Sequence, residues 1–334
     1  MSMKVVTMGG GTGQSVILRA LKGLDCEITA IVGMADSGGS SGILRDDLKM
    51  LPPGDIRHCL LALTPGNNAF CELLNYRFEE GALKGHNLGN IFLAGLYKVD
   101  GDFVSAIQKL SKLLDVSDKV LPVTLDCINL SCELQSGIII KKEDEIDSFR
   151  GTGNDKIKSA WLEPAALLYE SARLAIEDAD YIIIGPGDLY TSIVQVLLAG
   201  GMKEALQKSH AKKIYFANLM KKFGQTNLLS LKEQIAEVEN YSGVNLDYVI
   251  ANNNFYFPEK VLERYRSVDC EVEYFEAKDF AGVDYKLICC DLLASKIYEP
   301  LPSDPLKNRS MIRHDFMKIR RILMDLLYGY NTTA

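Results

Sequence analysis

Four side chains near the start of the chain have the chemistry of a general acid or base: Asp36, Asp55, His58 and His86. Carboxylates and imidazoles are the groups that most often transfer protons in enzyme sites. A serine nucleophile is not indicated, because the chain has only four histidines and no G-x-S-x-G elbow. The sequence does not separate the four candidates, so the catalytic residues stay unknown. Asp36 and Asp55 are the candidates we carry forward, as catalytic groups or as metal ligands.

A glycine-rich turn, GGGTG at residues 9–13, comes before these side chains. Glycines let the backbone approach a ligand closely, and the helix predicted after the turn would direct its amide groups toward an anion. Phosphate binding is the functional interpretation; a tight strand-to-helix turn is the structural one. The dinucleotide fingerprint G-x-G-x-x-G, counted from Gly9, needs glycine where this chain has Gln14, which disfavours a nicotinamide oxidoreductase. The residues predicted to hold phosphate are Gly10, Gly11, Thr12 and Gly13.

A second glycine-rich turn, MADSGGSSG at residues 34–42, follows the next predicted strand. Open α/β sheets bind ligands outside the carboxyl ends of their strands, so this turn begins where a ligand is expected. The alternative is a solvated turn, whereas a linker is not expected between adjacent elements of one sheet. The residues predicted to contact ligand are Asp36, Ser37, Gly38, Gly39 and Ser40.

Two further motifs place polar side chains at predicted helix starts. LPPGDIRHCLLAL, residues 51–63, brings Asp55 to a helix start, where it either caps the helix or forms an anion clamp with Arg57 and His58. GHNLGN, residues 85–90, places a histidine and two asparagines at another predicted helix start. The predicted ligand contacts are Arg57, His86, Asn87 and Asn90.

The strongest local signal is IIIGPGDLYTSI, residues 182–193, in which a buried strand ends at a glycine turn and a helix follows. This arrangement directs backbone amides and two hydroxyls outward from the carboxyl edge of the sheet. The next predicted strand ends at Asn218, before a loop that contains two lysines. The predicted binding residues here are Gly185, Gly187, Asp188, Leu189, Thr191, Ser192 and Asn218.

Alternating strands and helices must position these motifs. The first strand, turn, helix and strand form a βαβ unit, and its continuously apolar strands are typical of a parallel sheet covered on both faces. Further buried strands are predicted at 119–124, 179–185, 212–218, 247–252 and 285–291, and helices at 88–98, 102–113, 164–177, 189–199, 229–241 and 257–266. We therefore predict one α/β domain over 1–334, with a Rossmann-like, doubly wound, mostly parallel sheet. Two embellishments are expected, an antiparallel hairpin inserted at about 126–161 and an amphipathic C-terminal helix at about 312–329.

Composition excludes several classes of protein. A net charge of -7 argues against non-specific nucleic-acid binding, which needs clustered Lys and Arg. The longest apolar runs are shorter than the roughly 20 residues of a membrane span, and no signal peptide is readable. Eight cysteines without a C-x-x-C pair are typical of a reduced, cytoplasmic protein. The sequence leaves a homo-oligomer open.

Together, GGGTG, ADSGGSSG, LPPGDIRHCLLAL, GHNLGN, GPGDLYTSI and NLM occur in this order over nearly the whole chain. This set resembles the gluconeogenesis factor family of the YvcK type, bacterial relatives of 2-phospho-L-lactate transferase. The resemblance implies a Rossmann-like core that binds UDP-sugars such as UDP-N-acetylglucosamine. It also implies a cytoplasmic role in gluconeogenic growth, cell-wall growth and cell shape, without a settled reaction. From the same resemblance, Arg313, in an Arg-His-Asp element, and Tyr265 are expected to help bind the nucleotide sugar.

This chain departs from the pattern of that family at four places. Ser37 stands where a second acid is common, Gln195 where proline is usual, and KKFGQT where the family is closer to TQPGET. Phe316 follows the Arg-His-Asp element, which excludes a regulatory phosphothreonine at that position. The missing acid at position 37 argues against metal-dependent chemistry.

Two functional hypotheses follow from the sequence. The first is a regulatory factor that binds a nucleotide or nucleotide-sugar, and the sequence identifies no cofactor for it. The second is a transferase for a phospholactyl or related group on a nucleotide-diphosphate carrier, in which Asp36 and Asp55 would hold Mg²⁺.

Overall fold

A seven-stranded parallel sheet forms the centre of the protein in the computed structural model, which describes residues 2–66, 69–149, 151, 155–266, 270–297 and 312–330. The strand order is β12-β10-β8-β7-β1-β2-β3, as predicted for a doubly wound α/β fold. The strands are β1 (Met3–Gly9), β2 (Cys26–Val32), β3 (Lys119–Pro122), β7 (Tyr181–Ile184), β8 (Lys212–Phe216), β10 (Tyr248–Asn252) and β12 (Lys286–Cys290).

The order of the strands reverses beside β1. The chain runs from β1 to β2 and β3 on one side, and later builds β7, β8, β10 and β12 on the other. β1 pairs with β2 from Met3 to Gly9 and with β7 from Val5 to Met8. The inner strands are mostly apolar, and Ile182, Ile183 and Ile184 are fully buried. Such strands are stable only when helices cover both faces of the sheet.

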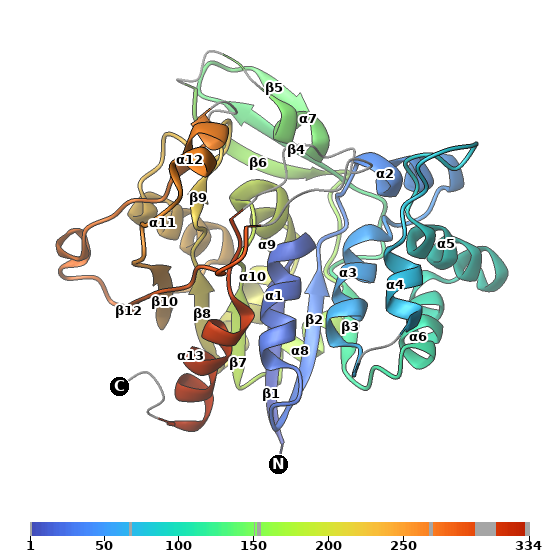
Figure 1. Cartoon of the computed structure of the whole chain (residues 1–334), viewed down its shortest axis with the longest axis horizontal. Coiled ribbons are helices and arrows are strands. Elements are labelled where there is room, and N and C mark those ends of the chain that lie inside the picture. Colours follow the sequence, from blue (N-terminus) through green and yellow to red (C-terminus); the bar gives the residue numbers. More distant parts are fainter. Residues whose placement is uncertain are drawn as a thin grey trace.

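Helices lie on both faces of this sheet. Figure 1 shows α1 (Gly11–Leu21) and α13 (Phe316–Tyr328) in front of the central strands and α8 (Glu170–Glu177) and α10 (Met202–Lys208) behind them. The remaining helical elements are α2 (Gly39–Leu48), α3 (Gly54–Leu63), α4 (Ala69–Asn75), α5 (Leu88–Asp100), α6 (Phe103–Leu113), α7 (Glu143–Ser148), η1 (Leu189–Val194), α9 (Gln195–Leu197), α11 (Leu231–Ser242), α12 (Glu259–Arg266) and η2 (Ala277–Phe280).

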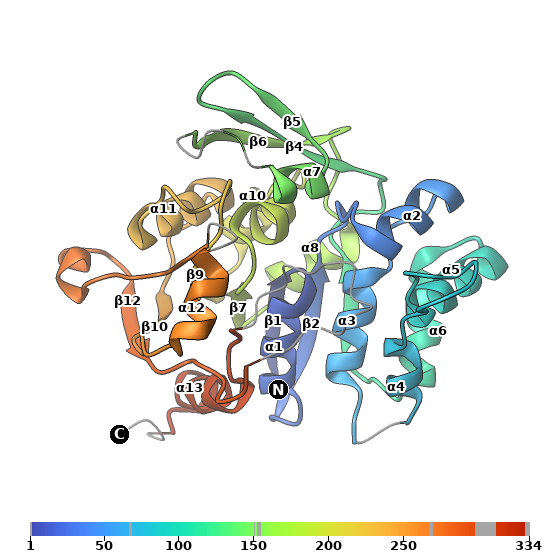
Figure 2. The same ribbon diagram turned by 45° about the horizontal axis from the view of Figure 1, so that its top comes forward.

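A second, antiparallel sheet stands over the carboxyl edge of the first (Figures 1 and 2). Its strands are ordered β5-β4-β6, with β4 (Asn129–Leu134), β5 (Ile139–Lys141) and β6 (Ile157–Glu163). The predicted hairpin corresponds to β4 and β5. The prediction missed β6 as a partner of β4, because that strand is separated from the hairpin by α7 and its pairing is not local. A small two-stranded pairing, β9 (Met220–Lys221) with β11 (Glu271–Val272), lies beside β8.

Three predicted helices have different limits in the structure. The helix predicted at 164–177 begins only at Glu170. The segment predicted as a helix at 189–199 is a π-helical turn, η1, that continues into α9. The closing helix begins at Phe316 rather than near residue 312, because the Asp315 side chain accepts hydrogen bonds from Met317 N (2.8 Å) and Lys318 N (3.3 Å). This is the geometry of a helix N-cap, which ends the extended segment before it.

The structure also bears on two predictions from composition, those on membrane-spanning helices and on the cysteines. Within the part of the chain that the structure describes, no helix is long and apolar enough to cross a membrane. All eight cysteines are free thiols, two of them buried, Cys59 and Cys132.

Candidate functional site

The two phosphate-type turns meet where the strand order reverses. Gly13, at the start of α1, has no room for a side chain, because a Cβ atom there would lie 2.1 Å from the carbonyl oxygen of Pro186. The GGGTG turn after β1 is therefore packed directly against the Gly185–Gly187 turn after β7. A crevice outside the carboxyl ends of strands at such a switch point is the usual ligand site of doubly wound sheets.

The amide end of α1 faces this crevice. Its N-cap is Gly10, which offers no side chain to the first amide groups, and Gly11 has a positive φ of 60°. Asp55 lies beside the turn, since a Cβ atom on Gly10 would be 2.5 Å from Asp55 Oδ2. Asp55 does not cap α3, whose N-cap is Pro53, and its carboxylate is directed at the GGGTG turn instead. A negative charge is favourable there because the helix N-terminus carries a partial positive charge.

Gln14 has a structural role, which explains why this chain has no glycine at the last position of the G-x-G-x-x-G fingerprint. Its side chain is fully buried and donates from Nε2 to Thr7 Oγ1 (3.0 Å), Thr7 O (3.1 Å) and Ile31 O (3.1 Å). These bonds fasten α1 to β1 and β2. A glycine at position 14 would remove all three and leave buried carbonyl groups without this donor.

Asp36, in the loop after β2, lies close to the start of α3. Its Oδ1 accepts a hydrogen bond from Gly38 N at 3.0 Å. Its Oδ2 faces Gly54, where a Cβ atom would lie 3.2 Å away. Asp36 and Asp55 thus both lie at the first turn of α3, close enough for the two catalytic candidates to face one ligand.

Ser37 and Ser40 connect the MADSGGSSG turn to its neighbours. The Ser37 hydroxyl donates to the Asp144 carboxylate and accepts from Asp144 N at 3.0 Å, which ties the turn to α7 below the small sheet. A second acid at position 37 would therefore face the Asp144 carboxylate. The buried Ser40 Oγ accepts hydrogen bonds from Asn87 N (3.1 Å) and Asn90 Nδ2 (3.3 Å). These bonds attach the GHNLGN motif to the MADSGGSSG turn.

Arg57 is buried in this supporting layer. It donates to Asn90 Oδ1 (2.9 Å) and Asn75 Oδ1 (2.8 Å), and one of its nitrogens lies 2.9 Å from His58 Nε2. His86 Nδ1 is 3.3 Å from Ser40 Oγ. These contacts hold α3, α4 and α5 together; a direct contact of Arg57 or His86 with a bound anion stays a prediction.

The turn after β7 is fixed by Asn218 at the end of β8. Asn218 Oδ1 accepts from Gly187 N (3.1 Å), and its Nδ2 donates to Gly187 O (2.8 Å). Thr191 is buried, and both its hydroxyl and backbone N–H groups of η1 form hydrogen bonds with the Gln225 side chain. Ser192 is half-buried. Thr191 is thus a structural residue of the turn, and Gly187 is held in place by Asn218.

Four residues of the site are absent from the predicted binding residues, although Lys222 was noted in the loop after Asn218: Gln195, Lys222, Asp147 and Glu143. Gln195 accepts from Ala35 N at 3.0 Å and also donates to Thr191 O, so it joins the turns after β2 and β7. Lys222 forms ion pairs with Asp188 (2.6 Å) and with Asp147 of α7. Burial by itself lowers the pKa of the Lys222 ammonium, but these two carboxylates raise it above its usual value. The fourth of these residues is Glu143, also on α7.

Glu143 brings a further carboxyl group to the crevice. Burial, and then the charges of Asp36 and Asp147, raise its pKa well above the usual value for glutamate. The run KEDE at 142–145 was the available signal, but such a run is normally a solvated helix start. It is drawn into the site only because the small sheet places α7 over the carboxyl edge.

The donor chemistry of Asp36 and Asp55 suits Mg²⁺, which is commonly held by one or two carboxylates together with substrate phosphates. Among the residues placed in the structure, no group of three or more His, Cys, Asp or Glu has the geometry of a metal site. Any Mg²⁺ here would therefore depend on the oxygens of a bound phosphate.

The Arg-His-Asp element closes the side of the crevice next to β8. His314 Nε2 lies 3.2 Å from Ala217 O, one residue before Asn218, and burial lowers the pKa of His314 to about 4. Arg313 is half-buried beside it. Tyr265, on α12, accepts a hydrogen bond at its hydroxyl from Ile312 N (2.9 Å), so the two residues expected from the family resemblance lie at one corner.

A family model described as 2-phospho-L-lactate transferase CofD matches residues 5–293. Similar proteins include a putative gluconeogenesis factor of Thermoanaerobacterium thermosulfurigenes, 41% identical over 97% of both chains. The gluconeogenesis factor of Bacillus subtilis is 37% identical over 97% of this chain and 98% of its own. The fold is that of a UPF0052 family protein of Bacillus halodurans, whose crystal structure matches with a TM-score of 0.86 and 33% identity over 97% of this chain and 99% of that one.

Proposed function

The chain belongs to the 2-phospho-L-lactate transferase CofD family, and on that premise we propose that it is a gluconeogenesis factor that works by binding a nucleotide-sugar of the UDP-N-acetylglucosamine type. The observation that carries the proposal is the contact of Gly13 with Pro186, which joins two glycine turns at the switch point of the sheet. The gluconeogenesis factors among its relatives support the cellular role.

A diphosphate suits the crevice between these turns. The uncapped N-terminus of α1 offers amide groups and a positive dipole end to one phosphate. Asp36 and Asp55 suit hydroxyl groups of ribose or sugar, because a carboxylate accepts hydrogen bonds from hydroxyls. We assign the base or sugar end to the corner formed by Tyr265 and Arg313, beside Asn218. In this proposal the bound state is read by other components of a cytoplasmic system for gluconeogenic growth and cell-wall shape.

Ligand specificity is the direct test. We expect UDP-N-acetylglucosamine to raise the thermal unfolding midpoint in a saturable manner, with and without Mg²⁺, whereas NADH does not. Ligand at about 100 times its dissociation constant adds roughly 2.7 kcal/mol to the stability, which a thermal-shift titration detects. An Arg313→Ala variant should respond less, and an Arg321→Ala variant on α13 serves as the matched control. No response to any UDP-sugar would reject the proposal.

A second candidate is a Mg²⁺-dependent transferase that acts on a nucleotide-diphosphate-linked substrate. The specific observation in its favour is the pair Asp36 and Asp55, whose carboxylates lie at the first turn of α3, that of Asp55 beside the GGGTG turn. Stabilisation by GDP only when Mg²⁺ is present, lost in Asp36→Asn and Asp55→Asn, would favour this candidate over the first.

A further inference from the structure

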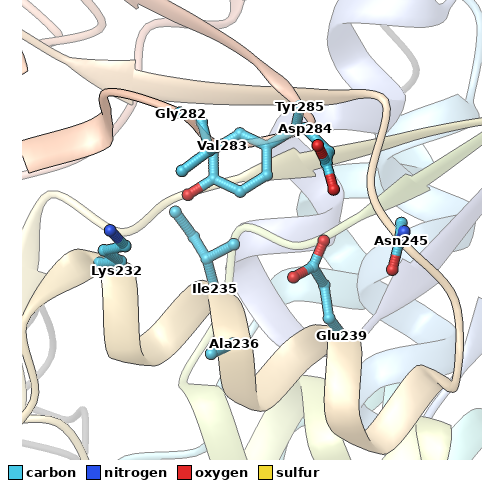
Figure 3. A pocket seen from close by; sticks show the side chains of 9 residues that line it. All are labelled: Lys232, Ile235, Ala236, Glu239, Asn245, Gly282, Val283, Asp284 and Tyr285. Carbon is cyan, nitrogen blue, oxygen red and sulfur yellow. The ribbon is translucent and has the colours of Figure 1, made fainter.

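A second pocket lies away from the crevice, on the outer face of α11. Its volume is about 230 Å³, and it lies between α11 and the segment 282–285 that leads into β12 (Figure 3). The helix contributes Lys232, Ile235, Ala236 and Glu239. These positions are i, i+3, i+4 and i+7, which share one face of a helix. None of the lining residues belongs to the site described above.

The pocket has opposite charges at its two ends. Figure 3 shows Lys232 at one end and the carboxylates of Glu239 and Asp284, with Asn245, at the other. Lys232 donates to the carbonyl oxygen of Asp279 at 3.2 Å, which holds the ammonium in place and leaves donors for a second acceptor. Glu239 Oε1 accepts from Leu246 N at 3.0 Å. Its second oxygen is directed toward the pocket.

The middle of the pocket is apolar. Ile235, Ala236 and Val283 lie between the charged ends, and the ring of Tyr285 lies over them (Figure 3). A ligand that spans this distance therefore needs a hydrophobic body, because polar atoms there would lose their hydrogen bonds to water without finding partners.

Tyr285 supplies a hydroxyl that the protein itself does not satisfy. The residue is 8% exposed, and its buried hydroxyl has no hydrogen-bond partner among the residues described. Burial, and then the charge of Glu239, raise the pKa of this phenol to about 12, so it keeps its proton at neutral pH. The hydroxyl lies on the Lys232 side of the pocket (Figure 3). A buried donor without an acceptor is costly, and an anionic ligand group at that end would satisfy it.

We propose that this pocket binds a short linear amino acid whose carboxylate and ammonium are separated by methylene groups. The carboxylate would meet Lys232 and the hydroxyl of Tyr285, and the ammonium would meet Glu239 and Asp284. The methylene chain would lie on Ala236 and Val283. The proposal does not depend on the nucleotide site.

Calorimetric titration of the full chain with 5-aminopentanoate tests the proposal. The matched probes pentylamine and pentanoate each lack one charged end. We expect 5-aminopentanoate to bind at least tenfold more tightly than either. Equal affinity for 5-aminopentanoate and pentylamine would overturn the two-ended assignment, and no saturable binding of 5-aminopentanoate would overturn the site.

Variants locate the binding. Glu239→Gln keeps the acceptor for Leu246 N but removes the charge, and we expect at least tenfold weaker binding of 5-aminopentanoate. Tyr285→Phe should weaken binding as well and, without ligand, raise the unfolding temperature, because it removes the unsatisfied hydroxyl. Glu204→Gln, on exposed surface of α10, is the matched control and should bind like the original protein. Unchanged binding in both pocket variants would contradict the proposal.

Discussion

The side chain of Asn218 forms two hydrogen bonds with the backbone of a single residue, Gly187. Its Oδ1 accepts from Gly187 N at 3.1 Å and its Nδ2 donates to Gly187 O at 2.8 Å. A side-chain amide can do both at once, because its oxygen accepts and its NH2 group donates. Asn218, just after β8, therefore fixes the turn after β7, although η1, α9, α10 and β8 lie between the two residues in the sequence.

Removal of this amide should weaken the nucleotide site without unfolding the protein. We expect Asn218→Ala to bind UDP-N-acetylglucosamine about thirtyfold more weakly, since two hydrogen bonds of roughly 1 kcal/mol each no longer order the turn. Calorimetric titration measures the effect. Asn240→Ala, on the exposed end of α11, is the control. Wild-type affinity in Asn218→Ala would show that the turn does not contact the ligand.

Gly13 allows a sharper test, because the space beside it is closed by backbone. A Cβ atom there would lie 2.1 Å from Pro186 O and 2.8 Å from Pro186 C, so Gly13→Ala must displace one of the two turns. We expect a loss of roughly 1–3 kcal/mol in the free energy of unfolding, as for other overpacked sites. Nucleotide-sugar binding should fall as well.

Gly95→Ala is the matched control for this change. Gly95 lies within α5, and a Cβ atom there would have nothing within 4 Å, so alanine should raise the free energy of unfolding by up to about 1 kcal/mol. Urea unfolding of both variants checks the pair. Equal stability of the two variants would contradict the close approach of the turns.

The central fold could be predicted because its signals are local and periodic. Continuous apolar strands that end in glycine turns specify a parallel sheet and place those turns at one edge, and Gly13 and Pro186 meet there as that logic requires. The pairing of β6 with β4 could not be predicted, because no local pattern identifies the partner of an isolated strand. The position of α7 depends on that pairing.

The side chains of the site likewise divide into those that a local sequence pattern predicts and those that depend on contacts between distant segments. Asp36 lies in a predicted turn and Asp55 directly after one, and both lie at the first turn of α3. Lys222 lies in the loop after Asn218, where the sequence indicated only that two lysines follow a strand end. Glu143 reaches the site through the small sheet, and nothing in its local sequence indicates this. The role of Gln14 was also hidden, because a buried amide that bonds to two strands has the same sequence appearance as a simple replacement of glycine.

His314 makes stability depend on pH. Its pKa is lowered to about 4 by burial, below the usual 6.5, so the unfolded chain binds the proton more strongly than the folded protein. The stability is fully present above pH 6.5 and is lost as the pH falls toward 4. Between pH 7 and pH 5 this one group should cost roughly 2 kcal/mol.

Urea unfolding at the two pH values measures this slope. His314→Gln keeps a donor for Ala217 O but does not titrate, so we expect it to lose less stability than the original protein between pH 7 and pH 5. His210→Gln, which changes an exposed histidine, should retain the full loss. The same loss in all three proteins would show that His314 is not the responsible group.

Glu143 has the opposite pH dependence. Burial and the carboxylates of Asp36 and Asp147 raise its pKa well above the usual 4.5, so its protonated form is favoured in the folded state. Its contribution to stability is fully present below pH 4.5 and is lost as the pH rises through the raised pKa. Glu143→Gln, which cannot ionise, should therefore be more stable than the original protein at pH 8, with a smaller difference at pH 5. Glu145→Gln, an exposed neighbour on α7, should show no such change. If Glu143→Gln has the same effect at both pH values, the carboxyl group of Glu143 is not held among the carboxylates of the crevice.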